Sequence, residues 1–253
     1  MRKSRMQRCI DYIRFTYESE GFSLSDDDEA DIRAVLDKDI TADSLIEKYI
    51  ITNSLTNHDY VASDDDFNYY ENTRCLFNFF DIKDRKKLRE VAIYITSIRT
   101  AELMVMPIDG PFDLEKLEAI HSSLFSDIYP SAGTLRTKMA AKRTEFCRPA
   151  YIVSSSRDLF NKLSKDHYLR KLTREEFIND LAYYMGELEA IHPFRNGNAQ
   201  ATRLFFWELI FFAGYVIDWR NCDPDRFLEA DICAIDGDYQ PLIDVLEEVV
   251  YEK

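Results

Sequence analysis

The spacing of apolar residues predicts a chain made mainly of helices. From residue 6 to residue 17 they recur every three or four positions, which is the stripe of one helix face, and Gly21 follows as a C-terminal stop. Ser25 and Thr41 have the type and position of N-caps for two further short helices. Residues 1–50 are therefore predicted to form a three-helix unit, which is too small to hold a large core and should pack on the rest of the chain.

The helical period fails in residues 51–70, a polar segment with an aspartate run at 64–66, which we interpret as a linker. It resumes in residues 86–104 and 112–125, on either side of a Pro/Gly break. Between 133 and 153, β-branched and aromatic residues indicate an irregular β-hairpin. Thr173 and Glu176 then have the spacing of a capping box before a long helix. The predicted architecture is all-α with one small hairpin, divided into residues 1–50, the linker 51–70 and a main domain, 71–253.

Composition narrows the class of function. The 253 residues contain 32 Lys and Arg against 46 Asp and Glu, a formal net charge of −14. Such acidity argues against a general binder of nucleic acid or of anionic membranes, although it permits a local phosphate site. The most apolar stretch, residues 204–213, is too short to span a bilayer, and the five scattered cysteines are typical of reduced thiols. The sequence therefore predicts a soluble, cytoplasmic protein.

One segment carries candidate chemistry, residues 192–203, which read HPFRNGNAQATR. Pro193 disfavours helical geometry at His192, Gly197 and Asn198 tolerate positive φ, and the helical pattern then resumes. A loop that feeds a helix N-terminus can hold an anion, which Arg203 could also face. His192 can exchange protons near neutral pH. The residues fit a phosphate-holding loop with a histidine base, and they fit equally a tight connection with a buried histidine.

The same segment resembles the signature of Fic-domain proteins, H-P-F-x-[D/E]-G-N-G-[R/K]-x-x-R. The matching residues are His192, Pro193, Phe194, Gly197, Asn198 and Arg203. The stretch FDLEKLEAIHSSLFSDIYPSAGTLR resembles the family's earlier helix and turn, and TEFCRPAYI resembles its flap hairpin. The resemblance covers about residues 70–250 in the family's order. It implies the Fic fold, a helical bundle with a small β-hairpin flap.

The resemblance also implies a reaction, transfer of AMP from ATP, with Mg²⁺, to a Ser, Thr or Tyr hydroxyl of a target protein. His192 would be the general base, Phe194 would anchor the loop, and the flap near 145–152 would align the target as an added strand. The residues placed at the nucleotide phosphates are Arg195, Asn196, Gly197, Asn198, Ala199, Gln200 and Arg203, with Asn196 at the metal position. The flap residues placed against the target are Phe146, Cys147 and Arg148.

Three positions depart from the family pattern. Asn196 replaces an acidic residue, and a neutral amide should hold Mg²⁺ less well. Ala199 replaces a glycine, and this replacement would cost about 1–2 kcal/mol if the position required positive φ. Gln200 replaces a basic residue and so removes a positive charge. We favour AMP transfer because the motif's histidine, asparagine and second arginine are present. The alternatives are transfer of another moiety, such as the γ-phosphate, and a degenerate domain that binds nucleotide or a partner without transfer.

Residues 16–21, TYESEG, fit the family's inhibitory pattern [S/T]-x-x-x-E-[G/N] at Thr16, Glu20 and Gly21. The helices around them resemble the small antitoxin that accompanies some Fic toxins. The resemblance implies that Glu20 pairs with Arg203 and occupies the place of the γ-phosphate, which would block productive ATP binding. The alternative is that Glu20 is a solvated residue at a helix end. A toxin–antitoxin type of protein further suggests subunits of DNA gyrase or topoisomerase IV as targets.

Overall fold

The structure is a computed structural model that describes residues 4–56 and 69–253. Its elements are α1 (Arg5–Ser19), α2 (Asp26–Leu36), α3 (Ala42–Thr52), α4 (Arg85–Val105), α5 (Leu114–Phe125), η1 (Pro149–Tyr151), α6 (Ile152–Lys165), η2 (His167–Leu169), α7 (Arg174–Ile191), α8 (Asn198–Ala213), β1 (Tyr215–Ile217), η3 (Trp219–Asn221), α9 (Pro224–Ile235), α10 (Gln240–Val249) and β2 (Val250–Glu252). The predicted all-α fold is confirmed. Most of the predicted linker, residues 57–68, lies outside the described residues.

The helices begin at the side chains that the sequence marks as caps. The Ser25 hydroxyl accepts from the Asp28 N–H at 3.1 Å, and Thr41 accepts from the Ser44 N–H at 3.3 Å. At the start of α7, Thr173 takes part in a complete capping box. Gly21 follows α1 with a φ of 76°, as a C-terminal stop requires. Short-range hydrogen-bonding rules therefore set these boundaries.

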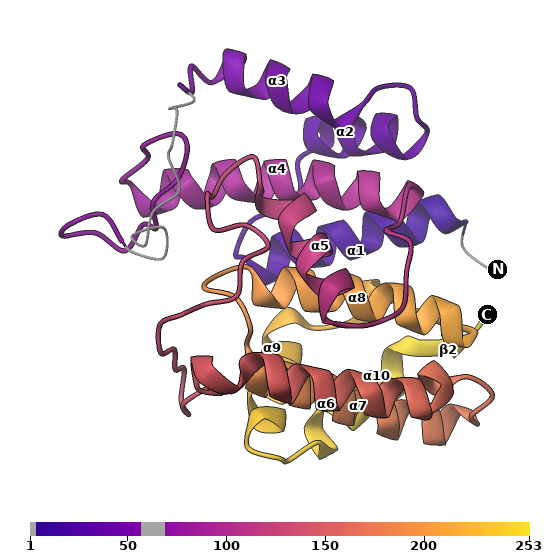
Figure 1. Ribbon diagram of the computed structural model, residues 1–253. Coiled ribbons are helices and arrows are strands. Elements are labelled where there is room, and N and C mark those ends of the chain that lie inside the picture. Colours follow the sequence, from indigo (N-terminus) through magenta and orange to yellow (C-terminus); the bar gives the residue numbers. More distant parts are fainter. Residues whose placement is uncertain (1–3, 57–68) are drawn as a thin grey trace.

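The helices form successive layers (Figure 1). α2 and α3 pack on one side of α4, and α1 packs between α4 and α9. α5 packs on α8, and α7 contacts α6, α8, α9 and α10 on the far side of the molecule. The buried apolar residues of all these helices belong to one continuous core. The motif loop, residues 192–197, joins α7 to α8 at the edge of that core.

α1 is part of the core and not an appendage to it. Tyr12 meets Trp207 and Trp219 edge-on, at ring-centroid distances of 6.5 and 5.7 Å. Phe15 lies 4.4 Å from Trp219 and 5.6 Å from Phe227. Buried aromatic rings such as these typically stabilise a fold by about 3–5 kcal/mol each, judged by their replacement with alanine. The first helix of the predicted 1–50 unit is therefore anchored in the same core as residues 71–253.

The regular strands lie outside the predicted hairpin. β1 and β2 pair antiparallel, with Tyr215 opposite Glu252, near the C-terminal end of the chain. Within residues 133–153 a single bridge joins Ala141 to Glu145, and we call residues 137–148 the flap. The predicted hairpin extends too far, because a 3₁₀ turn follows Arg148 directly and leads into α6. Pro149 at the start of that turn favours this ending.

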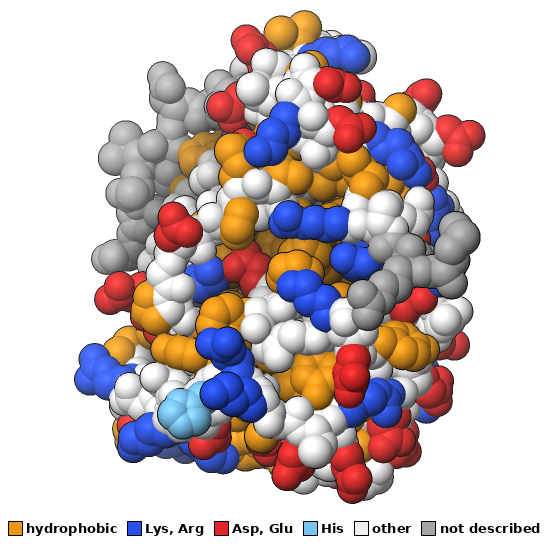
Figure 2. Space-filling view, turned by 90° about the vertical axis from the view of Figure 1, so that its right-hand side faces the viewer, with side chains coloured by type: hydrophobic (Ala, Val, Ile, Leu, Met, Phe, Trp, Pro, Cys, Tyr) orange, Lys and Arg blue, Asp and Glu red, His pale blue; other side chains and the backbone are white. Residues whose placement is uncertain are grey.

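The acidic charge of the chain is not spread evenly. Lys and Arg side chains cross the middle of the face seen in Figure 2, among hydrophobic ones. At the C-terminal end of α8, Arg5 and Lys253 lie over the ring of Phe211, and Arg170 lies over Phe212. Such contacts hold cations against aromatic surface.

None of the helices in the described ranges is long and apolar enough to cross a membrane.

Candidate active site

His192 lies where α7 ends and the motif loop begins. It takes left-handed backbone angles, φ 48° and ψ 65°, while its N–H still donates to the Leu188 carbonyl oxygen at 3.0 Å. Pro193 follows, so the predicted end of the helix at His192 is confirmed. A non-glycine residue in this conformation costs about 1–3 kcal/mol and persists only where its surroundings hold it.

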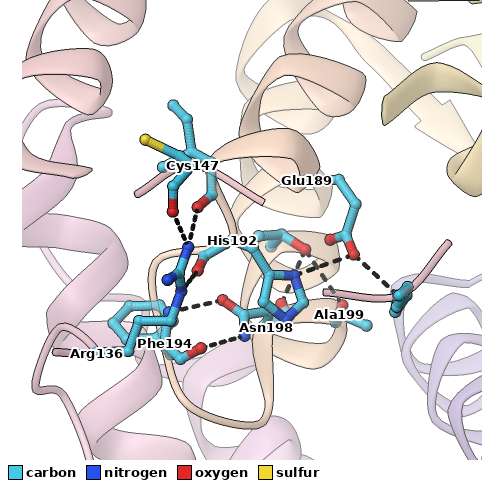
Figure 3. A network of polar contacts seen from close by, with 10 residues as sticks. Arg136, Cys147, Glu189, His192, Phe194, Asn198 and Ala199 are labelled. Carbon is cyan, nitrogen blue, oxygen red and sulfur yellow. Dashed lines mark hydrogen bonds and ion pairs between the residues drawn. The ribbon is translucent and has the colours of Figure 1, made fainter. Parts of the chain in front are cut away.

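The buried side chain of Arg136 supplies that support. Its guanidinium, in a residue only 2% exposed, donates to the His192 carbonyl oxygen at 2.7 Å and to the Ile191 carbonyl oxygen at 3.2 Å. It also donates to the Cys147 carbonyl oxygen (Figure 3). A further hydrogen bond, of 3.0 Å, runs to the carbonyl oxygen of Lys138. A rigid fork of five donors suits this task, which a lysine could not perform. Arg136 fastens the flap to the motif loop, and nothing in the sequence distinguishes it from the other basic residues of its segment.

The Asn198 side chain closes the motif loop on itself. Its Oδ1 accepts from the Phe194 N–H and its Nδ2 donates to the Phe194 carbonyl oxygen, both at 2.8 Å (Figure 3). Phe194 is fully buried, so its predicted anchoring role is confirmed. Asn198 is itself only 2% exposed. Its amide therefore shapes the loop, and its predicted contact with phosphate stays a prediction.

Gly197 gives the loop its close approach to α5. Its φ is 70°, and a Cβ at this position would lie 2.4 Å from the ring of Phe125. α8 begins at the next residue, and its N-terminal N–H groups have no side-chain cap. Ala199 and Gln200 stand in the first turn of α8, where Ala199 needs no positive φ, so the predicted strain at Ala199 does not arise. The arrangement is that of an anion site at a helix N-terminus.

His121 supports the loop from α5 and was not among the predicted site residues. Its Nδ1 accepts from the Gly133 N–H at 2.8 Å, which leaves Nε2 to donate to the Asn196 carbonyl oxygen at 3.0 Å. The ring also stacks on Phe194, with centroids 3.8 Å apart. Burial lowers the pKa of His121 to about 4, so the ring stays neutral and structural at physiological pH.

The predicted metal position does not form a resident Mg²⁺ site. Asn196 offers one neutral amide oxygen, and its main-chain oxygen is already bonded to His121. No cluster of three or more His, Cys, Asp or Glu side chains suited to a metal ion occurs in residues 4–56 and 69–253. Mg²⁺ is usually held by one or two carboxylates together with substrate phosphates. These donors therefore do not fit a metal held by the protein. The neighbouring Arg195 lies over the ring of Tyr69, 4.8 Å from its centroid.

Arg203 is buried against α1. Among the described residues, its Nε and Nη2 have no hydrogen-bond partner, although Arg203 is only 8% exposed. The guanidinium carbon lies 5.7 Å from the ring centroid of Phe15. Burial raises the pKa of Tyr12 to about 12, and the adjacent Arg203 opposes that rise. Two unpaired, buried N–H groups on a charged side chain are costly unless a ligand binds them.

The expected pair between Glu20 and Arg203 is not formed in this structure. Glu20 ends α1, and its carboxylate lies 3.4 Å from the guanidinium of Arg89. Arg89 Nη2 also donates to the Glu20 carbonyl oxygen, which fixes the helix end on α4. The other two residues of the inhibitory pattern behave as helix-end residues, with the Thr16 hydroxyl donating to the Tyr12 carbonyl oxygen at 3.1 Å and Gly21 in the stop position. The predicted partner of Glu20, Arg203, is therefore wrong for this structure, because the packing of α1 on α4 places Arg89 beside the carboxylate instead.

The His192 ring is held on two sides. Phe146 of the flap stacks on it, with centroids 3.8 Å apart and planes within 3°. On the edge of the ring, Nδ1 lies 3.3 Å from Glu189 Oε1 (Figure 3). Lys142 Nζ lies 3.0 Å from the same oxygen. The carboxylate and the flap ring thus contact the histidine directly, and the cation reaches it only through the shared carboxylate oxygen.

The two carboxyl groups near this cluster respond oppositely to their surroundings. Burial would raise the pKa of Glu189, but His192 and Lys142 outweigh burial and hold it below its ordinary value. Burial raises the pKa of Asp231 on α9, and the nearby charge of Glu189 raises it further. Glu189 therefore keeps its negative charge, while Asp231 takes up a proton more readily.

The predicted flap residues line one cavity of about 860 Å³. Phe146, Cys147 and Arg148 form its flap side, and Tyr151 and Tyr183 lie among its other walls. The Cys147 N–H donates to a carbonyl oxygen of α7 at 3.0 Å, so the base of the flap is fixed. Phe146, which stacks on the ring of His192, is therefore also part of the cavity wall.

The tip of the flap is bound to α9. Arg143 makes a two-point ion pair with Glu229, at 2.6 and 2.9 Å, and the Thr144 hydroxyl donates to Asp236 at 2.7 Å. These residues are exposed, so solvent screens their charges and each contact contributes little to stability. The tip is therefore held weakly, in contrast to the base.

The sequence comparisons agree with this geometry. The Fic/DOC family profile matches residues 111–210, which include the motif loop. A probable protein adenylyltransferase, y4lH of Sinorhizobium fredii, is 34% identical over 175 residues, 68% of this chain and 90% of that protein. The probable protein adenylyltransferase Fic of Escherichia coli is 32% identical over 69% of this chain and 87% of its own length. The chain therefore belongs to the Fic/DOC family.

Two further likenesses extend the comparison. Protein adenylyltransferase VbhT of Bartonella schoenbuchensis is 37% identical over 174 residues, 68% of this chain, and the alignment spans 36% of that longer protein. The crystal structure of BepC from Bartonella tribocorum, with bound AMPPNP, superposes with a TM-score of 0.67 at 28% identity. It covers 73% of this chain and 96% of that one. The nucleotide in that structure is an ATP analogue.

Proposed function

We propose that the chain transfers AMP from ATP to a hydroxyl side chain of a target protein, with His192 as the general base. The observation that carries the proposal is that the oriented histidine occurs in the same motif as an uncapped helix N-terminus and as Arg203, whose Nε and Nη2 have no hydrogen-bond partner among the described residues. Homology to protein adenylyltransferases and the ATP analogue bound by a structural neighbour support the same reaction.

In this mechanism the ring of His192 takes the proton of the target hydroxyl. The hydroxyl oxygen forms a bond to the α-phosphorus of ATP, and the bond from that phosphorus to the bridging oxygen of the β-phosphate breaks, so pyrophosphate leaves. The N–H groups at the start of α8 face the phosphates, and Arg203 stabilises the charge that develops on the leaving group. Positioning and electrostatic stabilisation supply most of such catalysis.

The target would dock along the flap. An extended segment could pair with the backbone of residues 146–148 and place its hydroxyl next to His192, with neighbouring side chains in the adjoining cavity. For the target itself, the family resemblance favours a subunit of DNA gyrase or topoisomerase IV, in a cytoplasmic, toxin–antitoxin setting.

We also propose that α1 is an internal brake on this activity. Arg203 lies over the ring of Phe15 in α1, 5.7 Å from its centroid, so the helix that ends at Glu20 packs directly against the second arginine of the motif. The Glu20 carboxylate itself is held by Arg89 in this structure. The inhibitory pair would form if the Glu20 carboxylate left Arg89 and bound Arg203 instead.

The test uses ATP labelled at the α-phosphate, with purified gyrase or a bacterial lysate as the source of target. Three proteins are compared, the wild type, Glu20→Gly and Glu20→Gly/His192→Ala. Label that appears on a protein with Glu20→Gly, and disappears in the double variant, supports both transfer and brake. Absence of α-label in all three contradicts AMP transfer to these targets, and ATP labelled at the γ-phosphate would then test the alternative reaction.

A further inference from the structure

Glu189 is an unusual residue for its position. It lies on α7 one turn before His192 and is only 3% exposed. A buried carboxylate is costly unless it is paired, and removing one partner of such a pair leaves an uncompensated charge. One of its oxygens, Oε1, lies between His192 Nδ1 and Lys142 Nζ, at 3.3 and 3.0 Å. Within the described ranges, the other oxygen has no hydrogen-bond partner.

The architecture of the flap does not require this carboxylate. The flap is already fastened at its base by Arg136 and at its tip by Arg143 and Thr144. Lys142 retains 38% of its side-chain exposure, so solvent screens its ion pair with Glu189. One screened partner does not by itself account for a carboxylate that is only 3% exposed, and the other group beside that carboxylate is the imidazole of His192.

We propose that Glu189 is a positioning residue for His192, accepting the Nδ1 proton and thereby leaving Nε2 free to take the proton of the target hydroxyl. The inference rests on the proposed AMP transfer. A carboxylate at Nδ1 fixes the tautomer of the ring and stabilises the imidazolium that forms when the base is protonated. The ring has no well-aligned hydrogen bond at Nδ1 among the described residues, and such bonds commonly tighten when substrate binds.

The remaining contacts of the ring leave Glu189 as the group that can select the tautomer. Phe146 fixes the plane of the imidazole by stacking, and Arg136 fixes the backbone of His192 through its carbonyl oxygen. Neither contact involves a ring nitrogen. They set the orientation of the ring, while the carboxylate at its edge determines which nitrogen carries the proton.

The charges that face Glu189 come from several elements. Lys142 of the flap contacts the same carboxylate oxygen as His192. Burial and the charge of Glu189 raise the pKa of Asp231 on α9, while Lys142 and Arg203 of α8 oppose that rise. Asp231 takes up a proton more readily than Glu189, so the ionised carboxylate is the one beside His192. Because Lys142 belongs to the flap, movement of the flap changes how much of that negative charge acts on the histidine.

The test combines a spectroscopic and a kinetic measurement on the full chain. The ¹⁵N chemical shifts of the His192 ring, recorded at about pH 8 where an ordinary histidine is neutral, report which nitrogen carries the proton. His192→Ala assigns the signals. The shifts are compared in wild type, Glu189→Ala, Glu189→Gln and the control Glu175→Gln, which removes an exposed carboxylate from the same helix. Thermal unfolding of each variant verifies that it is folded.

We expect the Nδ1–H tautomer in wild type, its retention in Glu189→Gln, whose amide oxygen still accepts, and its loss in Glu189→Ala. In the Glu20→Gly background, transfer of α-label should fall about ten- to a hundredfold in both Glu189 variants, which lack the charge. It should not change in Glu175→Gln.

An Nε2–H ring in wild type, or shifts unchanged in folded Glu189→Ala, would overturn the inference. Unchanged transfer in folded Glu189→Gln would overturn the electrostatic part of it. If the Glu20→Gly parent transfers no AMP, the proposed function fails, while the ring shifts still decide whether Glu189 selects the tautomer.

Discussion

The ring of Phe146 lies parallel to that of His192, with planes within 3° and centroids 3.8 Å apart. The flap and the motif loop therefore meet through two stacked rings directly at the catalytic candidate. A contact of this type is worth about 0.5–1.5 kcal/mol beyond burial of the ring. It ties the orientation of the histidine to the position of the flap.

Replacing Phe146 by Leu should keep the apolar volume but remove the planar partner of His192. Loss of the stack predicts a three- to tenfold decrease in the rate of α-label transfer, because about 1 kcal/mol of orientation is lost. The rate is measured in the Glu20→Gly background, and thermal unfolding serves as the control for stability. An unchanged rate would mean that Glu189 and Arg136 are sufficient to orient the ring.

Gly197 and Gly214 form a matched pair for testing the shape of the motif loop. Both have positive φ, 70° and 103°, but a Cβ at Gly214 meets no atom within 4 Å, whereas one at Gly197 would collide with Phe125. Gly214→Ala should lower the free energy of unfolding by about 1–2 kcal/mol through backbone strain alone. Gly197→Ala should lower it by roughly 2–5 kcal/mol, since overpacking adds to the strain. Urea denaturation measures both, and equal losses would contradict the close approach to Phe125.

His121 predicts a dependence of stability on pH. Burial lowers its pKa from 6.5 to about 4 in the folded chain, so the unfolded chain binds the proton more tightly. Its contribution to stability is therefore complete above about pH 6.5 and is lost as the pH falls toward 4, amounting to roughly 3 kcal/mol. The free energy of unfolding, measured from pH 7 to pH 4, should fall less steeply in His121→Gln. Parallel curves for the two proteins would rule out this role for His121.

Arg89 distinguishes two origins of the proposed brake. If inhibition requires Glu20 to reach Arg203, Arg89→Ala frees the carboxylate and should leave transfer of α-label low or lower it further. Glu20→Gly should raise it by about five- to a hundredfold, the usual range of coupling between sites. The initial rates of the two variants are compared with wild type. A rise in Arg89→Ala equal to that in Glu20→Gly would locate the brake in the Glu20–Arg89 contact itself.

Features set by neighbouring residues could be predicted from the sequence. The caps at Ser25, Thr41 and Thr173 and the helix end at His192 depend on side chains and on a proline within a few positions. Gly197 likewise shows the positive φ that its residue type favours. The resemblance to Fic proteins added the order of the elements, because a twelve-residue motif identifies the loop that the family shares.

Features set by tertiary placement could not be predicted. Arg136 resembles every other basic residue near it until the fold brings four carbonyl oxygens around its guanidinium. Glu189 is one of several acidic residues on α7, and only the position of the flap distinguishes it. The expected partner of Glu20 differed from the observed one for the same reason, since Arg89 and Arg203 are equivalent as sequence and are separated only by the packing of α1 against α4.

Arg136 gives the molecule a mechanical property. One guanidinium grips the backbone of the flap at Cys147 and the backbone of the loop at His192, so neither segment can shift without pulling on the other. A displacement of the flap at Cys147 is therefore coupled to the peptide group of His192 through these two hydrogen bonds. Binding of a target segment along the flap and the backbone position of His192 are therefore mechanically coupled through the side chain of Arg136.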